Sequence, residues 1–189
     1  MNSDDIQKAL YRHLEDKSHK YMCPNKHLDN WFECDMLSIT KADFLHEYEI
    51  KISGSDFKTD FKKIAKHLVL EGETTLTLDS ADPRIGQLRR TDFRKRKIIT
   101  EGDTKRYQFD FSHLMSPNYF WYVTPKGLLK EEEIPDYAGW IEVRTESNGR
   151  VYVSEKKQPK RLHRNKVTDK TKLRIMDSMM YRYWQLKLK

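Results

Sequence analysis

The chain has 189 residues, a formal net charge of +7 and a mean hydropathy of −0.89. This length predicts a single domain over residues 1–189, and two cysteines are too few for a disulfide-stapled secreted protein. No apolar run approaches the length of a membrane span and the N-terminal residues do not resemble a secretory signal, so we expect a cytoplasmic protein.

The first third of the chain is predicted to form a helix and two strands. Apolar residues at helical spacing predict a helix over residues 3–15, and the turn formers Pro24 and Asn25 indicate a loop after it. Strands are predicted over residues 31–39 and 42–53, where apolar and polar residues alternate.

Acidic side chains gather on one face of each predicted strand. Glu33 and Asp35 share a face of the first, and Glu47, Glu49 and Lys51 share a face of the second. If the strands pair, Asp35 and Glu49 converge on one cation, and carboxylate oxygens are the ligands that Mg²⁺ prefers. Lys51 can then hold a water molecule or offset charge on a phosphate. The spacing indicates a metal-dependent phosphodiesterase; the alternative is a solvated face of weak cross-strand ion pairs.

The motif of Asp35 with Glu49-Ile50-Lys51 resembles the PD-(D/E)XK nuclease superfamily. The similarity continues as the pattern E-x-K-x-S-x-x-D-F-x-x-D-x-K of MmcB-like DNA-repair nucleases and their phage-encoded relatives, here Glu49, Lys51, Ser53, Asp56, Phe57, Asp60 and Lys62. Residues 119–125 and 134–140 resemble the closing strands of that family, so the similarity covers residues 28–70 and 117–165.

The resemblance implies an α/β protein with a restriction-endonuclease-like αβββαβ core, in which helices flank a mixed central sheet. It also implies the site: Asp35, Glu49 and the Ile50 carbonyl bind Mg²⁺, for which Mn²⁺ can substitute, and Lys51 positions the hydrolytic water. Accessory roles are expected of polar residues near the motif or on the first helix, namely Glu15, Glu33, Glu47, Ser53 and Asp56.

The chain departs from the family pattern at two places near the motif. Cys34 stands where the superfamily has proline. The superfamily often takes a further acid from its first helix, and spacing leaves Asp5, Glu15 and Asp16 open, with Glu15 preferred.

The middle of the chain is predicted to be a helix followed by an insertion. The helix spans residues 55–70, with an apolar stripe toward the core and lysines toward a DNA backbone. Residues 72–112 have no counterpart in the family pattern, and we expect an inserted basic β-rich arm with short strands at 74–78 and 98–100.

The last third of the chain is predicted to return to the sheet. Residues 119–124 read as a strand buried on both faces, and an Asn-Gly pair at 148–149 predicts a hairpin. A final helix is predicted over residues 170–187, with its apolar stripe in the core: Leu173, Met176, Met180 and Trp184.

The excess of basic residues favours a polyanionic partner, and we expect DNA. The side chains predicted to contact DNA phosphates are Lys62, Lys66, Arg89, Arg90, Arg94, Lys95, Arg96, Lys97, Lys160 and Arg161. The alternative is that these clusters are solvated loops.

Together, the motif, its continuation and the basic clusters predict a Mg²⁺-dependent deoxyribonuclease of DNA repair, recombination or phage DNA metabolism. One alternative is a non-catalytic module on a nuclease-like fold that binds nucleic acid or a protein partner, and another is an RNA-directed enzyme of the same fold. The sequence leaves the strand preference, cleavage mode, specificity and oligomeric state open.

Overall fold

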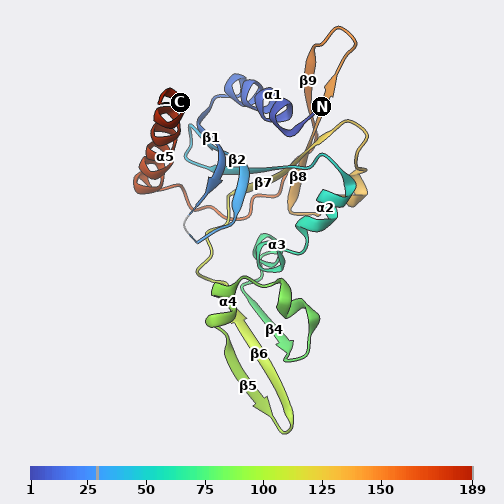
Figure 1. Ribbon diagram of the computed structural model, residues 1–189, viewed down its shortest axis with the longest axis vertical. Helices are drawn as coiled ribbons and strands as arrows, with labels where there is room; N and C mark the ends of the chain where they lie inside the picture. The colour runs from blue at the N-terminus through green and yellow to red at the C-terminus, as the bar shows by residue number, and fades with distance from the viewer. Residues whose placement is uncertain (29, 189) are drawn as a thin grey trace.

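The structure is a computed structural model that describes residues 1–28 and 30–188. It is a mixed α/β protein with a six-stranded sheet in the order β1-β2-β3-β7-β8-β9 and a separate three-stranded sheet in the order β4-β6-β5 (Figure 1). β3, β7 and β8 are parallel neighbours, and the other pairs are antiparallel. The expected α/β class and mixed sheet flanked by helices are confirmed.

The elements that belong to the larger sheet and its helices are α1 (Ser3–Asp16), β1 (His19–His27), β2 (Glu33–Thr40), β3 (Leu45–Ile50), α2 (Gly54–Asp60), α3 (Ile64–Glu71), β7 (Tyr119–Pro125), η2 (Glu131–Glu133), β8 (Ala138–Thr145), β9 (Val151–Lys157) and α5 (Asp169–Lys187). Among the helices of the described residues, none is long and apolar enough to cross a membrane.

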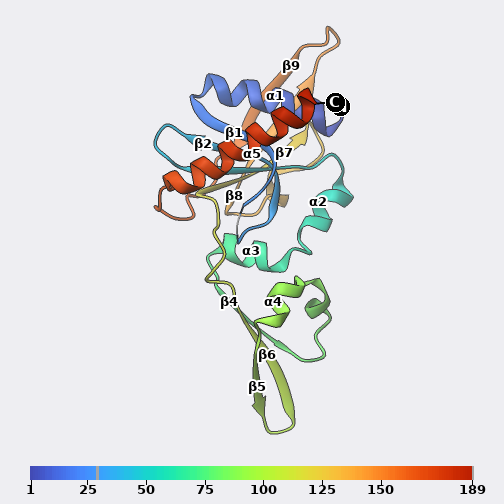
Figure 2. The ribbon, with the colours of Figure 1, turned by 60° about the vertical axis from the view of Figure 1, so that its left-hand side comes forward.

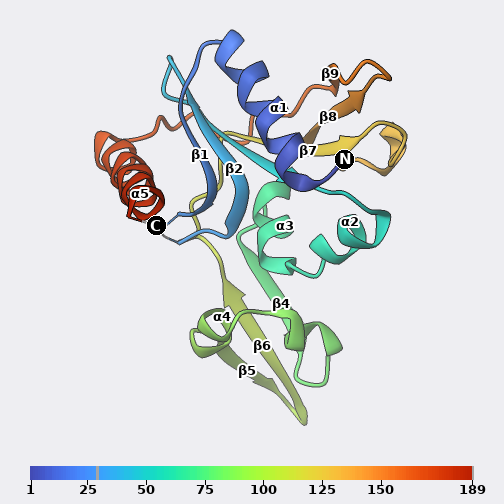
Figure 3. The same ribbon diagram turned by 45° about the horizontal axis from the view of Figure 1, so that its top comes forward.

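The two faces of the larger sheet carry separate apolar cores. One face packs on α1, where Ile6, Leu10 and Leu14 meet Tyr48 and Trp121 of the sheet. The opposite face packs on buried residues of α2, α3 and α5, and Figure 3 shows α1 and α3 on opposite sides of the strands. α1 starts with a capping box, because the Asn2 side chain accepts from the Asp5 N–H and Asp5 accepts from the Asn2 N–H.

β1 forms where the sequence indicated a loop. It pairs antiparallel with β2 at the edge of the sheet, and its register shifts between Lys20 and Cys23. Tyr21 and Asn25 have positive φ angles, and Pro24 is tolerated because an edge strand leaves donors unpaired. The loop signals were genuine local features of an irregular strand, and tertiary pairing overrode them.

The helix predicted over residues 55–70 is two helices. Ser53 caps α2 by accepting a hydrogen bond from the Asp56 N–H at 3.1 Å. The helical conformation is interrupted between Asp60 and Ile64, where α3 begins. α3 ends at Gly72, whose φ of 97° is the left-handed conformation that glycine adopts readily. The break separates Asp60 from Lys66, and both side chains are buried in the polar network described below.

The predicted arm folds as the smaller sheet and projects beyond α3 (Figure 2). Its elements are β4 (Thr75–Asp79), η1 (Pro83–Gln87), α4 (Arg90–Arg94), β5 (Lys97–Glu101) and β6 (Thr104–Asp110). β6 is the central strand and was not anticipated, since its exposed polar residues mask the alternation. Its buried Phe109 stacks on Phe111, and both belong to the apolar core that the larger sheet shares with α3.

The C-terminal strands and helix lie where the sequence predicts them, but α5 is not buried in the way that was predicted. β7 is buried on both faces and β8 and β9 form a hairpin, as predicted. α5 spans the predicted residues, but its apolar stripe is not in the core: Leu173 is 58%, Met180 56% and Trp184 54% exposed. The helix meets the protein through Ile175 on another face.

Gly139 of β8 is a site where the sheet tolerates no side chain. A Cβ there would lie 2.5 Å from Cε3 of Trp121 and 2.9 Å from Cδ of Pro159. We expect Gly139→Ala to lower the free energy of unfolding by about 1–3 kcal/mol, because a buried indole and a proline ring must move. Gly86→Ala, where a Cβ meets nothing within 4 Å, is the matched control. Urea denaturation measures both, and equal stability of the two variants would contradict the packing.

Two histidines on the α1 face make stability depend on pH. Burial, with the neighbouring His19 charge, lowers the pKa of His46 from 6.5 to about 3, and burial with Lys17 lowers the pKa of His19 to about 4. Because the fold favours the neutral rings, their contribution is complete above pH 6.5 and is lost as the pH falls toward 3.

We therefore expect the wild-type free energy of unfolding to fall between pH 7.5 and 4.5 by about 1–3 kcal/mol more than that of His46→Gln. Glutamine keeps an acceptor for the Trp121 Nε1–H, which donates to His46 Nδ1 at 3.1 Å, but cannot take a proton. His113→Gln, outside this ring cluster, should keep the wild-type pH dependence. Parallel slopes for wild type and His46→Gln would show that His46 is not responsible.

Candidate active site

Asp35, Glu49 and Lys51 lie together where β2 and β3 separate. The ladder between these strands ends at the pair of Met36 and Tyr48, and beyond it Asp35 Oδ2 accepts a hydrogen bond from the Ile50 N–H at 2.6 Å. The Asp35 side chain thus accepts the hydrogen bond that a backbone carbonyl of β2 would otherwise accept, and β2 and β3 separate at this point. The cleft that opens has a volume of about 540 Å³ and is lined by Ser3, Phe32, Glu33, Asp35, Glu49, Ile50, Lys51, Ile52, Asp56 and Lys63.

Asp35 is held in position but left without a counter-ion. Burial raises the pKa of its carboxyl, the negative charge of Glu49 raises it further, and the Ile50 N–H opposes both. Gln7 of α1 donates to the Asp35 carbonyl at 2.7 Å and fixes the strand end. Among the described residues Asp35 makes no ion pair, and its Oδ1 accepts no hydrogen bond, so this oxygen is available to a cation.

Glu49 is surrounded by three lysines. Its Oε2 lies 3.0 Å from Lys51 Nζ, its Oε1 accepts from Lys66 and its Oε1 lies 3.6 Å from Lys63 Nζ. Burial alone would raise its pKa, but the charges of Lys66, Lys51 and Lys63 outweigh burial and lower it. Glu49 is therefore an ionised carboxylate in an almost inaccessible position.

Lys51 is a fixed cation between two acids. Its Nζ lies 3.0 Å from Glu49 Oε2 and 3.1 Å from Asp60 Oδ1. Burial lowers the pKa of the ammonium, but the two carboxylates raise it above its ordinary value. A lysine that keeps its proton cannot act as a general base, so it can only donate hydrogen bonds or offset negative charge.

Lys66 and Glu47 form the floor of the site beneath Glu49. Both side chains are fully buried, and Lys66 Nζ lies 2.7 Å from Glu47 Oε1. Burial raises the pKa of Glu47 against the effect of Lys66, and Trp31 Nε1 donates to its Oε2 at 2.5 Å. The prediction that Lys66 contacts DNA is wrong, because its ammonium group is buried and pairs with Glu47 and Glu49 inside the protein. Glu47, outside the cleft, supports Lys66.

Asp60 joins the site to the sheet through residues that the sequence did not single out. Its Oδ1 lies 2.7 Å from Lys63 Nζ, and its Oδ2 accepts from the Tyr122 hydroxyl at 3.1 Å and lies 3.3 Å from His67 Nε2. Burial would raise the Asp60 pKa, but the His67 hydrogen bond and the lysines hold it far below its usual range. Asp60 stands in the extended motif, which was the available signal. Tyr122 lies in a segment predicted as a buried strand without a role in the site, and His67 had no signal.

The other accessory predictions divide by position. Glu33 and Asp56 line the cleft, whereas Ser53 is occupied as the cap of α2. The prediction for Glu15 is wrong, because Ser3 at the start of α1 lines the cleft and Glu15 lies near the other end of a helix about 20 Å long. An acid at that distance cannot share a ligand sphere with Asp35.

The donors present fit a hard divalent cation. Asp35 and Glu49 supply carboxylate oxygens, and Asp35 Oδ1 has no partner of its own among the described residues. Ile50 lines the same cleft, as a carbonyl ligand requires. The part of the chain that the structure describes contains no group of three or more His, Cys, Asp or Glu side chains placed to hold a metal. Two carboxylates with water and substrate oxygens are a ligand set that Mg²⁺ accepts.

The basic residues predicted to contact DNA fall into two groups. Arg89 forms a two-bond pair with Asp92 at 2.8 and 2.9 Å and stacks on Phe32, which lines the cleft, so the base of the arm adjoins the site. Others held by local contacts are Arg96, stacked on Phe93, Arg161, stacked on Phe44, and Lys160, near Asp136. Lys160 and Arg161 are nevertheless exposed, and so are Lys62, Arg90, Arg94, Lys95 and Lys97.

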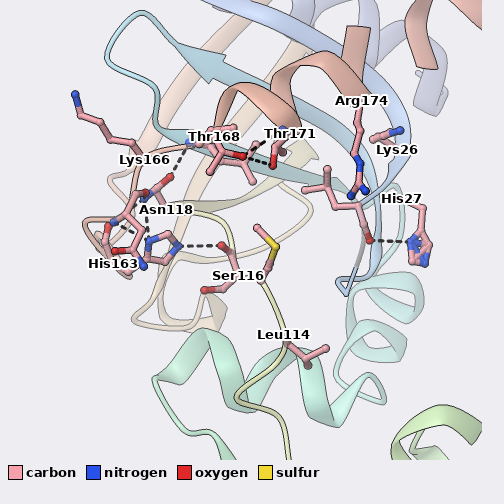
Figure 4. A pocket seen from close by; sticks show the side chains of 15 residues that line it. Lys26, His27, Leu114, Ser116, Asn118, His163, Lys166, Thr168, Thr171 and Arg174 are labelled. Atoms are coloured by element: carbon pink, nitrogen blue, oxygen red, sulfur yellow. Dashed lines mark hydrogen bonds between the residues drawn. The ribbon is translucent and has the colours of Figure 1, made fainter. Parts of the chain in front are cut away.

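A second hollow of about 320 Å³ lies at the other end of β3, next to Leu45 (Figure 4). Its wall is anchored by Asn118, which accepts from the Leu45 N–H at 2.7 Å and donates to the Asn165 carbonyl at 2.8 Å. His163 Nε2 lies 2.9 Å from the Ser116 carbonyl and donates to it. The hollow shares no residue with the cleft. The side chains of Asn118 and His163 already make hydrogen bonds to the residues around the hollow.

Comparisons with known proteins identify no family for this chain. No protein-family model matches it, and no curated protein matches it in sequence. Its structure is similar to that of a protein of unknown function from Silicibacter pomeroyi, with a TM-score of 0.51 and 10% identity over 95% of this chain and 86% of that one. At this identity the likeness shows the mixed α/β fold alone.

We expect Lys66→Met to destabilise the protein by about 3–5 kcal/mol, because it leaves Glu47 buried without a counter-charge and removes one of the three lysines around Glu49. The deficit relative to wild type should shrink at acidic pH, where the two carboxyls can take protons. Lys62→Met, at an exposed position, is the control and should cost little. Denaturation at pH 7.5 and 5 measures both. A deficit that is small at pH 7.5, or that does not change with pH, would show that Lys66 does not neutralise these acids.

Proposed function

We propose that this protein is a Mg²⁺-dependent nuclease that hydrolyses DNA phosphodiester bonds. The observation that carries the proposal is the convergence of Asp35, Glu49 and a charged Lys51 in one cleft at the end of β3. The order α1-β1-β2-β3, then α2 and α3, then β7 is the αβββαβ order that the resemblance to PD-(D/E)XK nucleases implies, and β7 lies parallel to β3.

The roles of the residues follow from their surroundings. Asp35 and Glu49 would hold Mg²⁺, with the Ile50 carbonyl beside them; the cation supplies Lewis-acid polarisation of the phosphate and activation of water. Lys51 keeps its proton, so it orients the water and offsets negative charge on the phosphate. Asp60 and Lys66 fix Lys51 and Glu49 in place, and Asp35 keeps its orientation through the Ile50 N–H.

DNA as the substrate is supported by charge and position. The net charge is +7, and the exposed Arg90, Arg94 and Lys95 lie on or directly after α4. Arg89, which precedes α4, stacks on Phe32 at the rim of the cleft, so a strand that enters the cleft can follow the arm. The family resemblance connects such an activity with DNA repair, recombination or phage DNA metabolism, in the cytoplasm.

One observation favours a second candidate, a DNA-binding module without catalysis. Both oxygens of Glu49 are already paired with lysines, so a cation must compete with Lys51, Lys63 and Lys66 for that carboxylate. If the cation does not displace these lysines, Glu49 stays neutralised by them and the cleft holds no metal. This candidate predicts salt-sensitive DNA binding without metal-dependent turnover.

The deciding experiment is cleavage of labelled single- and double-stranded DNA with Mg²⁺ or Mn²⁺. We expect Asp35→Asn and Lys51→Met each to lower the rate by about 100-fold or more, since each removes charge stabilisation at the phosphate. Asparagine still accepts from the Ile50 N–H, which preserves the strand end. Glu33→Gln, on the rim of the same cleft, is the matched control and should keep most activity.

Binding measured without cleavage, in EDTA, separates the two candidates. The nuclease proposal expects Asp35→Asn to bind DNA about as well as wild type while failing to cut it. Cleavage at the same rate by wild type, Asp35→Asn and Lys51→Met would refute the assigned site. Binding without any turnover in either metal would favour the non-catalytic module.

A further inference from the structure

α5 presents an apolar face to solvent that no other described part of the chain covers. Seven large side chains form it, each between 43% and 78% exposed: Leu173, Met176, Met180, Tyr181, Tyr183, Trp184 and Leu188. A helix that is apolar on its outer side as well as its docking side normally has something packed against both. This face is called the outer face of α5 below.

The outer face lies opposite the side by which α5 is attached. Ile175 is fully buried against the core, and Arg182 donates to the carbonyls of Pro24 and Asn25 in β1. With about 100° between successive residues, Leu173 and Trp184 lie about 160–180° around the helix from Ile175. The attachment therefore cannot bury the outer face by a small rotation. Figures 1 and 2 show α5 lying along the outside of the molecule.

The size of the outer face matches what a stable complex needs. Large side chains present about 150–250 Å² each, so seven that are roughly half exposed offer about 800 Å². That is about one partner's share of a standard protein interface, and more than the apolar patch of a few hundred Å² common on monomers.

The chemistry of the outer face favours a second copy of this chain over nucleic acid. From Leu173 to Leu188 the charged positions are Arg174, Asp177, Arg182 and Lys187. Arg174 lines the hollow beside Leu45 (Figure 4), so the outer face itself carries Asp177 and Lys187, one of each sign, and has no cationic excess for phosphates. Lys172, at the attached end, is engaged with Asp43 and Asp169, and Arg182 with β1. A two-fold interface uses the same patch on both partners, and an apolar stripe with 3-4 spacing is complementary to a copy of itself.

We propose that the protein forms a two-fold symmetric dimer in which the outer faces of two α5 helices pack antiparallel. A pair centred at residue 182 sets Met180 against Trp184 of the other copy and Tyr181 against Tyr183 of the other copy. This proposal goes beyond the proposed nuclease function and does not depend on it, because its tests read assembly and not cleavage.

The first test uses the unaltered full-length chain. Trp184 is 54% exposed, whereas Trp31, Trp121 and Trp140 are nearly or fully buried, so quenching by acrylamide reports on α5. We expect Trp184 to be protected at about 50 µM protein and to become several-fold more accessible on dilution, in step with a change from dimer to monomer by sedimentation velocity. A monomer at every concentration up to about 200 µM would overturn the proposal.

The second test places a charge in the outer face. Met180→Glu and Trp184→Glu should each give a folded monomer and raise the dissociation constant by at least about 100-fold. The matched control is Ile98→Glu, because Ile98 is an equally exposed apolar residue on β5 of the arm, and it should leave the dimer intact. Dimers that persist in both α5 variants would overturn the interface. A monomer in which Trp184 becomes protected only when DNA is added would also overturn it, and would assign the face to nucleic acid.

Discussion

The buried ammonium of Lys66 is the interaction on which the rest of the site depends. It reaches from α3 to two acids of β3, Glu47 and Glu49, and so joins a helix to the central strand with charge in place of apolar contact. Taking three charges out of water is costly unless each is paired and hydrogen-bonded. The network meets that condition, because Trp31 donates a hydrogen bond to Glu47 and Lys51 donates to both Glu49 and Asp60. As a result, Glu49 is held in a fixed orientation in the cleft.

This arrangement explains why the helix after β3 is broken. Asp60 ends α2 and Lys66 lies in the first turns of α3, and the two side chains must enter the same network from different helices. A single straight helix over the same residues would place them six positions apart on different faces. The tertiary requirement for both charges therefore overrides the uninterrupted helical pattern.

The two carboxylates of the cleft are held in opposite electrostatic states. Glu49 is kept ionised by lysines, whereas burial raises the pKa of Asp35, which has no counter-ion among the described residues. A divalent cation would supply the charge that Asp35 lacks. The separation of β2 from β3 at Asp35 gives such a cation access from solvent. The inserted arm, whose base touches the rim through Arg89 and Phe32, extends this surface away from the sheet.

Strand alternation is a local property, so the pattern of residues was enough to indicate which side chains can meet. It placed Glu47, Glu49 and Lys51 on one face and located β7, the β8–β9 hairpin and α5. It could not decide burial. Lys66 looked like a surface lysine, Glu15 was preferred over Asp5 and Asp16 as a further acid of the site, and the stripe of α5 looked like core. Each outcome depends on which distant element packs against the residue. Whether a charge is neutralised inside the protein, or an apolar face stays exposed, is therefore set by long-range packing and not by local sequence.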